Sequence, residues 1–407
     1  MSREPASVAI VRRKSSTVPR RLRGMLALDD FEQKARRLLP KPIFEYVRGG
    51  VETDWSLAAN RSDFGRYGLR PRVLRDMAGR SIATTLFGEE HSLPVGIAPM
   101  GFSAVAAYDG DVTLAKGARA AGSFAICSAA SVTPLERVAT EGGSRWFQTY
   151  IPGDETRIGA LIDRLLRSGF DTLVVTADVP VSANRENNAR NGFDAPFRLS
   201  PKLLWQGVTH PRWSLGTLGR EMMTRGMPHF ENMESVQGPP LFSRTLVRST
   251  IARDRLCWAN LAYIRSRWPG KLIAKGLLHP DDAREAQSVG CDGIIVSNHG
   301  GRQLDGAISA LQALPDIRAA VPDMTVMFDS GIRRGTDVIK ALALGADFTF
   351  VGRPFLYAAA TYGVPGVQHA MRLLAEEIDR DMALLGLHTI ADLRAASPLV
   401  RPLGTPV

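Results

Sequence analysis

The residues that most clearly suggest chemistry follow short apolar runs of the sequence. Lys275 closes one such run, where an ammonium group would be costly unless it met an anion. His299 lies between Asn298 and two glycines, which is typical of a turn. Taken alone, these two residues have another interpretation, as a salt-bridged core lysine and a structural histidine. Polar or ligand-binding residues follow the other runs as well: Pro99, Met100, Gly101, Ser128, Gln148, Tyr150, Thr176, Asp178, Ser297, Asp329, Gly331, Gly352 and Arg353.

Two of these places suggest a phosphate site. Gly331 follows one apolar run, and Gly352 with Arg353 follows the last one. After the last two strands of a barrel, backbone N–H groups and a guanidinium commonly bind a dianionic phosphate. The sequence has no G-x-G-x-x-G motif that opens a helix after a strand, so it lacks the fingerprint of a nicotinamide dinucleotide.

The apolar runs are predicted to be β-strands that alternate with helices. Amphipathic stretches at 111–121, 155–168, 281–289 and 335–344 separate several of them. This alternation implies right-handed parallel crossovers, and eight units favour a closed (β/α)8 TIM barrel, an α/β fold, over an open doubly wound sheet. Chemistry in such a barrel gathers at the C-terminal strand ends, where the residues above fall, so we predict an active site there. The strands are expected at Leu93–Ala98, Phe124–Ser128, Arg145–Tyr150, Thr172–Ala177, Leu272–Lys275, Gly293–Ser297, Thr325–Asp329 and Phe348–Val351.

Outside the strand–helix units we expect three further parts. Residues 1–26 form a basic, disordered leader, residues 27–395 form one domain, and residues 396–407 form a C-terminal tail. The start of the domain, 27–92, is expected to cap the barrel with helices and a small sheet. The connection between the fourth and fifth strands is much longer than the others and holds an insertion at about 190–250. A connection of this length inside a compact domain is usually functional or disordered.

Composition limits the class of protein. The 407 residues are 44% hydrophobic and 23% charged, as in globular soluble proteins. Three widely spaced cysteines without a CxxC pair argue against disulfides and against a metal site, and fit a reducing compartment. The net charge is +10, and the leader is strongly basic. Such a leader suits nucleic acid, an anionic membrane or a cleaved presequence; we expect a solvated segment, with no nucleic-acid partner and no secretion.

The stretch from Ser297 to Gly306, SNHGGRQLDG, resembles the signature of the FMN-dependent 2-hydroxy acid dehydrogenase and oxidase family. The resemblance covers about residues 27–395. Within the family it is strongest to the membrane-associated (S)-mandelate dehydrogenases, through His210–Leu215 and Lys275–Leu278, and L-lactate dehydrogenase also belongs to the family. Further matching motifs are Leu39-Pro40-Lys41 with Tyr46, Trp146–Tyr150, Thr176–Asp178, Asn184–Glu186 and Asp329–Gly335.

The resemblance implies a role for each residue that faces the substrate. His299 would be the active-site base, and Asp178 would hold its imidazole. Arg302 and Arg185 would clamp the substrate carboxylate, which suits the fork geometry of guanidinium. The catalytic and substrate-binding set is completed by Tyr46, Tyr150 and Lys275.

The resemblance also implies FMN as the cofactor. Lys275 would face N1 and the C2 carbonyl of the flavin, where a cation stabilises the anionic reduced ring. The remaining cofactor-binding residues would be Pro99, Met100, Gly101, Ser128, Gln148, Thr176, Ser297, Asp329, Gly331, Arg333, Gly352 and Arg353.

Two small residues bear on the substrate and on the electron acceptor. Gly101 stands where many oxidases of the family carry alanine, which favours a quinone or cytochrome as acceptor. Ala130 stands where short-chain glycolate oxidases have tryptophan, which favours (S)-mandelate or another 2-hydroxy acid with an aromatic or long side chain. L-lactate, a peptide or cofactor precursor, and a flavin-binding barrel without turnover are the alternatives. The resemblance also implies a homotetramer.

The segment 198–230 of the insertion mixes aromatic, leucine and methionine residues with five basic residues and one acid, a net charge of +4. This composition is typical of a segment that lies on a membrane surface. We therefore expect a cytoplasmic protein on the inner face of the cell membrane. The alternative is that the apolar residues pack over the barrel mouth, or on a neighbouring subunit, as a substrate lid.

Overall fold

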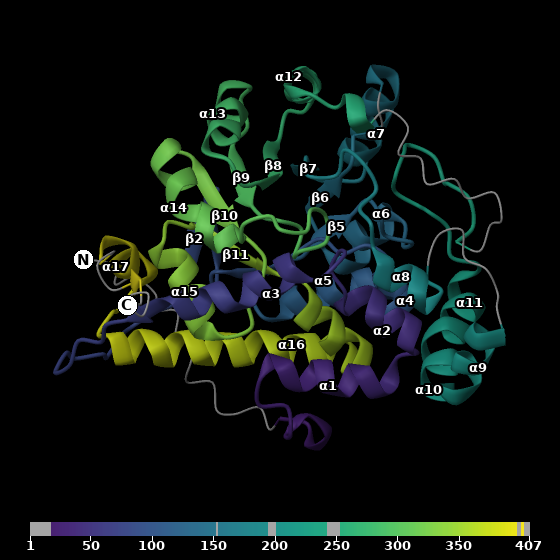
Figure 1. The fold of residues 1–407 in the computed structure, drawn as a ribbon, viewed down its shortest axis with the longest axis horizontal. Helices are drawn as coiled ribbons and strands as arrows, with labels where there is room; N and C mark the ends of the chain where they lie inside the picture. The colour runs from purple at the N-terminus through teal and green to yellow at the C-terminus, as the bar shows by residue number, and fades with distance from the viewer. Residues whose placement is uncertain (1–17, 152–153, 194–200, 242–252, 397–399, 403–407) are drawn as a thin grey trace, which may run out of the picture.

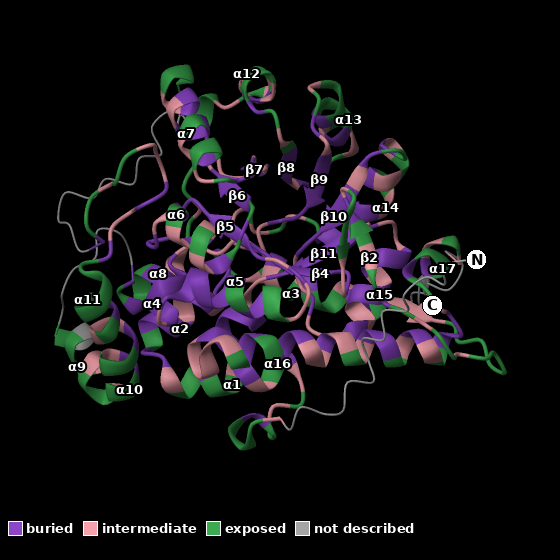
Figure 2. Ribbon diagram, turned by 180° about the vertical axis from the view of Figure 1, so that it is seen from behind, coloured by how far each residue is buried: buried purple, intermediate pink, exposed green. Residues whose placement is uncertain are grey.

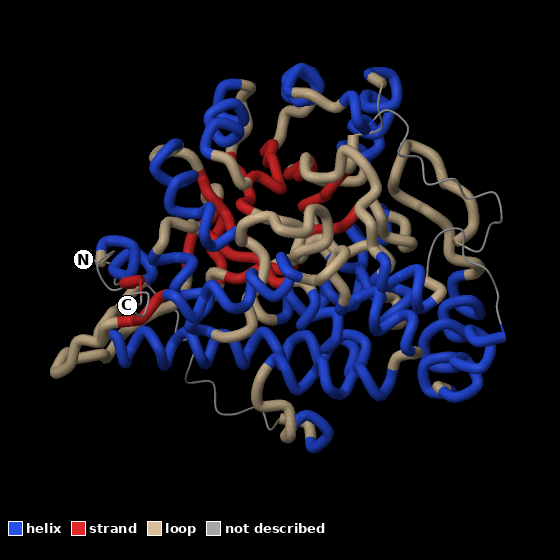
Figure 3. Tube along the Cα trace, in the orientation of Figure 1, coloured by secondary structure: helices blue, strands red, loops and turns tan. Residues whose placement is uncertain are grey.

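Eight parallel strands form the centre of the molecule (Figure 3). The structure, a computed structural model, describes residues 18–151, 154–193, 201–241, 253–396 and 400–402. Neighbouring strands follow one another around the barrel, and a parallel bridge between Ile97 and Ala125 joins the first strand to the second. The predicted TIM barrel and its eight strands are confirmed: β4 (Val95–Ile97), β5 (Ile126–Ser128), β6 (Trp146–Thr149), β7 (Thr172–Thr176), β8 (Lys271–Leu277), β9 (Gly293–Val296), β10 (Thr325–Phe328) and β11 (Phe348–Val351).

Helices surround the strands. The four predicted helices are confirmed as α5 (Gly110–Ala120), α7 (Glu155–Arg167), α13 (Pro280–Ser288) and α15 (Gly335–Ala343). The last barrel helix, α16 (Arg353–Leu385), changes direction at Gly363, where φ is 63°. The other helical segments of the barrel units are α4 (Ser103–Ala106), α6 (Leu135–Arg137), η3 (Val138–Gly142), α8 (Glu186–Asn191), η5 (Arg253–Arg255), α12 (Trp258–Arg267) and α14 (Ala310–Ala320), and α17 (Ile390–Ala395) follows α16.

The interior of the barrel is apolar at one end and polar at the other. Figure 2 shows that the strands are buried, whereas the outer faces of the helices are exposed. Strand residues alternate between the inside and the outside of a barrel. The apolar end is filled by a buried cluster, which consists of Leu86, Ala98, Ile126, Trp146, Val174, Ile273, Ile295, Met327, Phe348 and Phe350. Two positions further along β6, β7 and β8 stand Gln148, Thr176 and Lys275, so the same alternation makes the C-terminal layer polar.

The segments outside the barrel pack against it. The N-terminal part contains η1 (Arg20–Leu22), α1 (Leu28–Leu38), α2 (Lys41–Arg48), α3 (Trp55–Ser62), η2 (Asp63–Arg66), β1 (Tyr67–Leu69) and the hairpin of β2 (Thr84–Leu86) with β3 (Glu89–His91). Leu22, which falls within the expected leader at 1–26, is buried. Residues 1–17 lie outside the described residues. The expected C-terminal tail contributes β12 (Val400–Pro402), which pairs antiparallel with β1.

The described part of the insertion is helical, and α9 (Pro201–Thr209), α10 (Pro211–Trp213), η4 (Ser214–Gly219) and α11 (Arg220–Arg225) lie together at one end of the molecule (Figure 1). Trp213 corrects one expectation, because it is buried and its Nε1 donates to the carbonyl of Val105 at 2.9 Å. This tryptophan therefore fastens the insertion to α4 and is not available to a membrane.

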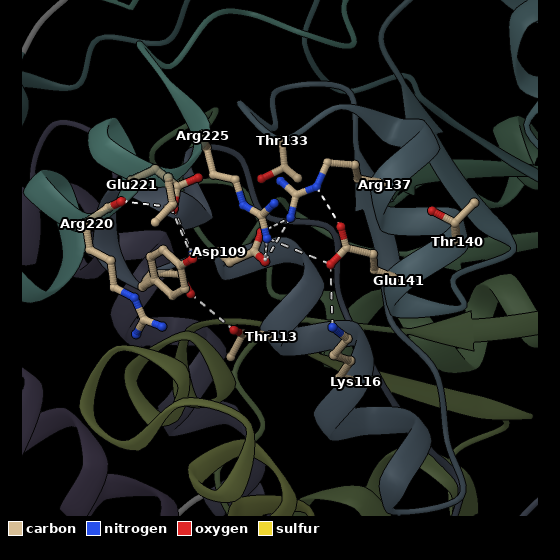
Figure 4. A network of polar contacts seen from close by, with 12 residues as sticks. Asp109, Thr113, Lys116, Thr133, Arg137, Thr140, Glu141, Arg220, Glu221 and Arg225 are labelled. Atoms are coloured by element: carbon tan, nitrogen blue, oxygen red, sulfur yellow. Dashed lines mark hydrogen bonds and ion pairs between the residues drawn. The ribbon is translucent and has the colours of Figure 1, made fainter.

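A network of charged groups also holds the insertion (Figure 4). The carboxylate of Asp109, just before α5, accepts two hydrogen bonds from Arg137 at 2.9 and 3.0 Å and pairs with Arg225 at 3.5 Å. The carboxylate of Glu221 accepts from the backbone N–H of Asp109 at 3.1 Å. The guanidinium of Arg220 lies 3.9 Å from the ring centre of Tyr108. Helix α11 is thus attached to the turn that precedes α5.

Candidate active site

A cavity of about 500 Å³ opens at the C-terminal ends of the strands. The predicted site residues that line it are Tyr46, Pro99, Met100, Gly101, Gln148, Tyr150, Thr176, Arg185, Lys275, His299, Arg302, Asp329, Gly331, Arg333, Gly352 and Arg353. Ser128, Asp178 and Ser297 stand behind this lining. Each of the three bonds to a residue of the lining, namely Gln148, His299 and Lys275 respectively.

His299 and Asp178 form a hydrogen-bonded pair. Nδ1 of His299 lies 3.0 Å from Oδ1 of Asp178, and the turn at His299 has φ 57°. Burial lowers the pKa of His299, although Asp178 opposes this shift. Burial raises the pKa of Asp178, but His299 and Lys275 lower it more, so the net shift is downward. The pair is therefore a carboxylate and a neutral imidazole whose Nε2 can accept a proton.

Close packing behind this pair requires a glycine. Gly276 has φ 100°, and a Cβ there would lie 2.6 Å from the carboxyl carbon of Asp178. A side chain at this position would push the Asp178 carboxylate out of place. The Lys275-Gly276 motif therefore brings together a cation and the space for the carboxylate.

Lys275 is buried between two oxygen-bearing side chains. Its Nζ lies 2.8 Å from Oδ2 of Asp329 and donates to Oγ of Ser297 at 2.8 Å. Burial lowers the pKa of this ammonium, but Asp329 and Asp178 raise it more, so the pKa is raised overall. Lys275 therefore presents a positive charge to the cavity.

Three guanidinium groups gather in one part of the cavity. Burial, followed by the charge of Arg353, lowers the pKa of Arg302 to about 10. Burial lowers the pKa of Arg353 to about 10 and also lowers that of Arg333. Arg302 and Arg353 both donate to the carbonyl of Gly49, at 2.5 and 3.2 Å. Cations that are buried together in this way favour an anionic ligand.

Arg302 also stands beside further groups that suit a small polar substrate. Nη2 of Arg185 donates to Oε1 of Gln303 at 2.8 Å, and its Nε donates to the carbonyl of Arg302 at 3.3 Å. The Arg302 guanidinium lies 5.1 Å from the centre of the Tyr46 ring. Tyr150 lines the same cavity. Two guanidiniums, two phenols and an imidazole can bind a carboxylate and remove a proton beside it.

The donor set also fits a flavin mononucleotide. Nε2 of Gln148 is buried and has no hydrogen-bond partner in the described part of the chain, while Oε1 of Gln148 accepts from Ser128 at 3.0 Å. The amide thus has a donor left over for a ligand carbonyl. Lys275 supplies a cation to the same cavity, and Arg333 with Arg353 supplies cations for a phosphate.

Sequence reasoning missed one wall of the cavity. Phe230, Met233 and Glu234, from the segment that follows α11, line it together with Arg157 of α7. Nε of Arg157 donates to Oε2 of Glu234 at 3.2 Å. The composition of the insertion indicated a lid over the barrel mouth as one of its possible roles. The pairing of Arg157 with Glu234 could not be predicted, because the two residues are far apart in sequence and belong to no motif.

Comparison with known proteins shows the family of this chain. The family model described as FMN-dependent dehydrogenase matches residues 35–399. The chain belongs to this family. An L-lactate dehydrogenase of Pseudomonas entomophila (strain L48) is 40% identical over 385 residues, which cover 93% of this chain and 99% of the relative. One of Azorhizobium caulinodans is 39% identical over 372 residues, 90% of this chain and 96% of the relative.

Solved structures of the family are similar throughout. The crystal structure of the monotopic membrane protein (S)-mandelate dehydrogenase has a TM-score of 0.83 and 33% identity, and the match covers 93% of this chain and all of that one. Mandelate oxidase with benzoyl-formic acid has a TM-score of 0.75 and 33% identity, and the match covers 93% and 98% of the two chains. The chain is therefore an FMN-dependent oxidoreductase of the 2-hydroxy acid dehydrogenase and oxidase class. Among the described residues, no cluster of His, Cys, Asp and Glu is suited to a metal ion.

Proposed function

We propose that this enzyme oxidises (S)-mandelate, or another L-2-hydroxy acid with an aromatic or long side chain, to the 2-oxo acid. The observation that carries this proposal is the apolar wall of the cavity, formed by Phe102, Ala130, Ile151, Phe230 and Met233. The small side chain of Ala130 leaves room for a ring, and the surrounding apolar groups favour one.

The proposed catalytic residues surround the reacting carbon. His299 takes a proton from the substrate at Nε2, and the Asp178 carboxylate stabilises the imidazolium that results. Arg302 and Arg185 hold the substrate carboxylate, and Tyr46 and Tyr150 orient the carboxylate and the hydroxyl. FMN, when bound, accepts the two electrons of the oxidation.

The proposed cofactor contacts come from nearly every strand end. Lys275 would face the pyrimidine side of the ring, and Asp329 would hold the ribityl chain. Gly331, Arg333, Gly352 and Arg353 would hold the phosphate. Pro99, Met100, Gly101, Gln148 and Thr176 would hold the ring further, with Ser128 and Ser297 positioning Gln148 and Lys275 from behind.

L-lactate is the second candidate substrate, because the curated relatives with about 40% identity are L-lactate dehydrogenases. Anaerobic reduction of the bound flavin by (S)-mandelate, L-lactate and glycolate in turn separates the two. We expect the highest kcat/KM with mandelate. In the variant Ala130→Trp the added ring fills the space beside the apolar wall, so mandelate should lose activity while lactate retains it. A wild type that prefers lactate, and an Ala130→Trp variant that affects both acids equally, would support the lactate assignment.

We further propose that the electrons pass to a quinone or cytochrome at the inner face of the cell membrane, and that the insertion contacts that membrane. Apolar side chains stand exposed on it: Leu204, Trp205, Val208, Leu215 and Met223. The similar (S)-mandelate dehydrogenase is a monotopic membrane protein. In the described part of this chain no helix is long and apolar enough to cross a membrane.

A homotetramer is the proposed assembly. The segment 70–79 carries the exposed side chains of Val73 and Leu74. Exposed apolar side chains that lie together favour contact with another subunit. Light scattering should give the mass of four chains, and Leu74→Asp should reduce it.

A further inference from the structure

A carboxylate that the proposed mechanism does not use lies behind one wall of the cavity. Asp111 is the second residue of α5, and its side chain is buried. Its Oδ2 accepts hydrogen bonds from Oγ of Ser103 and from Oγ of Ser131, the latter at 2.6 Å. Both serines are completely buried. Ser103 begins α4, after β4, and Ser131 lies in the loop after β5, so one carboxylate joins two separate segments.

Each serine follows a residue that lines the cavity. Ser103 comes directly after Phe102, and Ser131 comes directly after Ala130. The backbone N–H of Phe102 donates to the carbonyl of Ala130 at 3.0 Å. The loops after β4 and β5 therefore form one continuous piece of wall, and Asp111 is bonded to both from behind.

Only a thin layer separates Asp111 from the cavity. A second, small cavity of about 10 Å³ is lined by Asp111, Cys127, Met100 and Ala98 among others. Met100 and Ala98 also line the large cavity. A displacement of the Asp111 contacts would therefore reach the large cavity directly through Met100, Phe102 and Ala130.

The Asp111 carboxylate is costly in this place. Burial raises its pKa to about 6, and the hydroxyls of Ser103 and Ser131 only partly offset this. The neighbouring Asp109 is of like charge and is engaged with Arg137 and Arg225. Cys127, on β5, has a pKa raised well above its usual value by burial, so it is a neutral thiol. A buried carboxylate bonded to neutral hydroxyls adds little stability, which points to a role in geometry.

We propose that Asp111 is a positioning residue for the reaction: by accepting from Ser103 and Ser131 together, it fixes the loops that carry Gly101, Phe102 and Ala130, and so sets the width of the substrate side of the cavity. The proposal rests on the proposed function only for the choice of substrates. The residues that face the substrate from the other walls, His299 and Arg302 among them, are held by different contacts.

The test uses the FMN-loaded enzyme and the variant Asp111→Asn. Both serines donate to the same oxygen, Oδ2, and a neutral amide oxygen accepts more weakly than a carboxylate oxygen, so both bonds weaken and both loops are held less firmly. KM for the preferred 2-hydroxy acid should rise about tenfold or more, kcat should change less, and the preference between large and small acids should weaken. The FMN dissociation constant should change little, because the phosphate contacts come from other loops.

A second variant and a control make the result specific. Ser131→Ala removes one of the two bonds completely and should also raise KM, and its effect should not add fully to that of Asp111→Asn. The control variant Asp379→Asn removes another buried carboxylate. Asp379 lies on α16 and accepts hydrogen bonds from Arg80, so this variant should lower the free energy of unfolding without a change in KM. An unchanged KM in both cavity variants, full additivity, or an equal KM rise in Asp379→Asn would overturn the proposal.

The same test remains informative if no 2-hydroxy acid reduces the wild type, which would refute the proposed function alone. The visible circular dichroism of the bound flavin needs no substrate. It should change in Asp111→Asn and Ser131→Ala and remain unchanged in Asp379→Asn. Identical spectra in all three variants would count against the role of Asp111.

Discussion

Gly101 and Ala130 face each other so closely that a Cβ on Gly101 would lie 2.7 Å from the Cβ of Ala130 and 3.3 Å from its carbonyl oxygen. The same carbonyl accepts the hydrogen bond from Phe102. The Ala130 loop therefore cannot move away without weakening that bond. The glycine thus allows the two loops of the wall to touch.

Gly101→Ala should consequently affect the substrate side as well as the electron acceptor. We expect kcat/KM for flavin reduction to fall by about tenfold to a hundredfold, since a displacement of the wall misplaces the substrate. The double variant Gly101→Ala with Ala130→Gly removes the opposing Cβ and should recover most of this loss. Stopped-flow reduction under anaerobic conditions measures both. No recovery in the double variant would mean that the contact with Ala130 is not the cause.

Asp178→Asn should change the pH dependence as well as the rate. Burial lowers the pKa of His299 and Asp178 opposes that shift, so the acid limb of kcat/KM in the wild type should lie below pH 6.5. Without the carboxylate the opposing effect is lost, and the limb should move to still lower pH. The rate on the plateau should fall by about 10²- to 10⁴-fold. A limb that moves toward higher pH would contradict the assignment of the Asp178 charge.

Much of the fold and of the site was predictable, for a simple physical reason. Strand residues alternate, and the C-terminal ends of barrel strands meet at one mouth, so Gln148, Thr176 and Lys275 could be placed together from sequence alone. The same reasoning could not tell that Ser128 and Ser297 stand behind the lining. Whether a serine lines the cavity or stands behind the lining depends on its side-chain hydrogen bonds, and these produce no periodic pattern in the sequence.

In the insertion, amino-acid composition alone does not predict which side chains are exposed and which are buried. Trp205 and Trp213 are the same residue type in the same segment, so composition cannot distinguish them. Trp205 is exposed, whereas Trp213 is buried and donates to a backbone carbonyl. The pairing of Arg157 with Glu234 joins α7 to the insertion, and no spacing rule links two such ordinary residues. Contacts between segments distant in sequence depend on the tertiary fold.

Lys275→Met should weaken both the fold and the flavin site. The variant leaves Asp329 buried without its cation, and breaking a buried pair in this way costs about 3–5 kcal/mol. The free energy of unfolding of the apoprotein in urea measures this. The reduction potential of bound FMN should also become more negative, because the reduced anionic ring loses a counter-charge. Lys275→Met with Asp329→Asn should recover stability but not the potential; recovery of both would remove Lys275 from its proposed place at the ring.

Membrane binding should depend on the exposed apolar residues of the insertion more than on its charges. Arg220 already stacks on Tyr108, and Arg225 already pairs with Asp109, so their contribution to an anionic surface, about 1 kcal/mol each when free, is reduced. Trp205 and Leu215 are 64% and 72% exposed. We therefore expect the double variant Trp205→Ser with Leu215→Ser to release the enzyme from anionic vesicles while flavin reduction by substrate continues at the wild-type rate.

Leu384→Ser, which removes a leucine of the same 64% exposure from α16, is the matched control and should not change vesicle binding. Co-sedimentation at low and high salt checks both. If the wild type does not bind vesicles at low salt, the insertion keeps only its role as a wall of the cavity. If high salt alone abolishes binding, the charged residues of the insertion, and not its apolar residues, account for membrane binding.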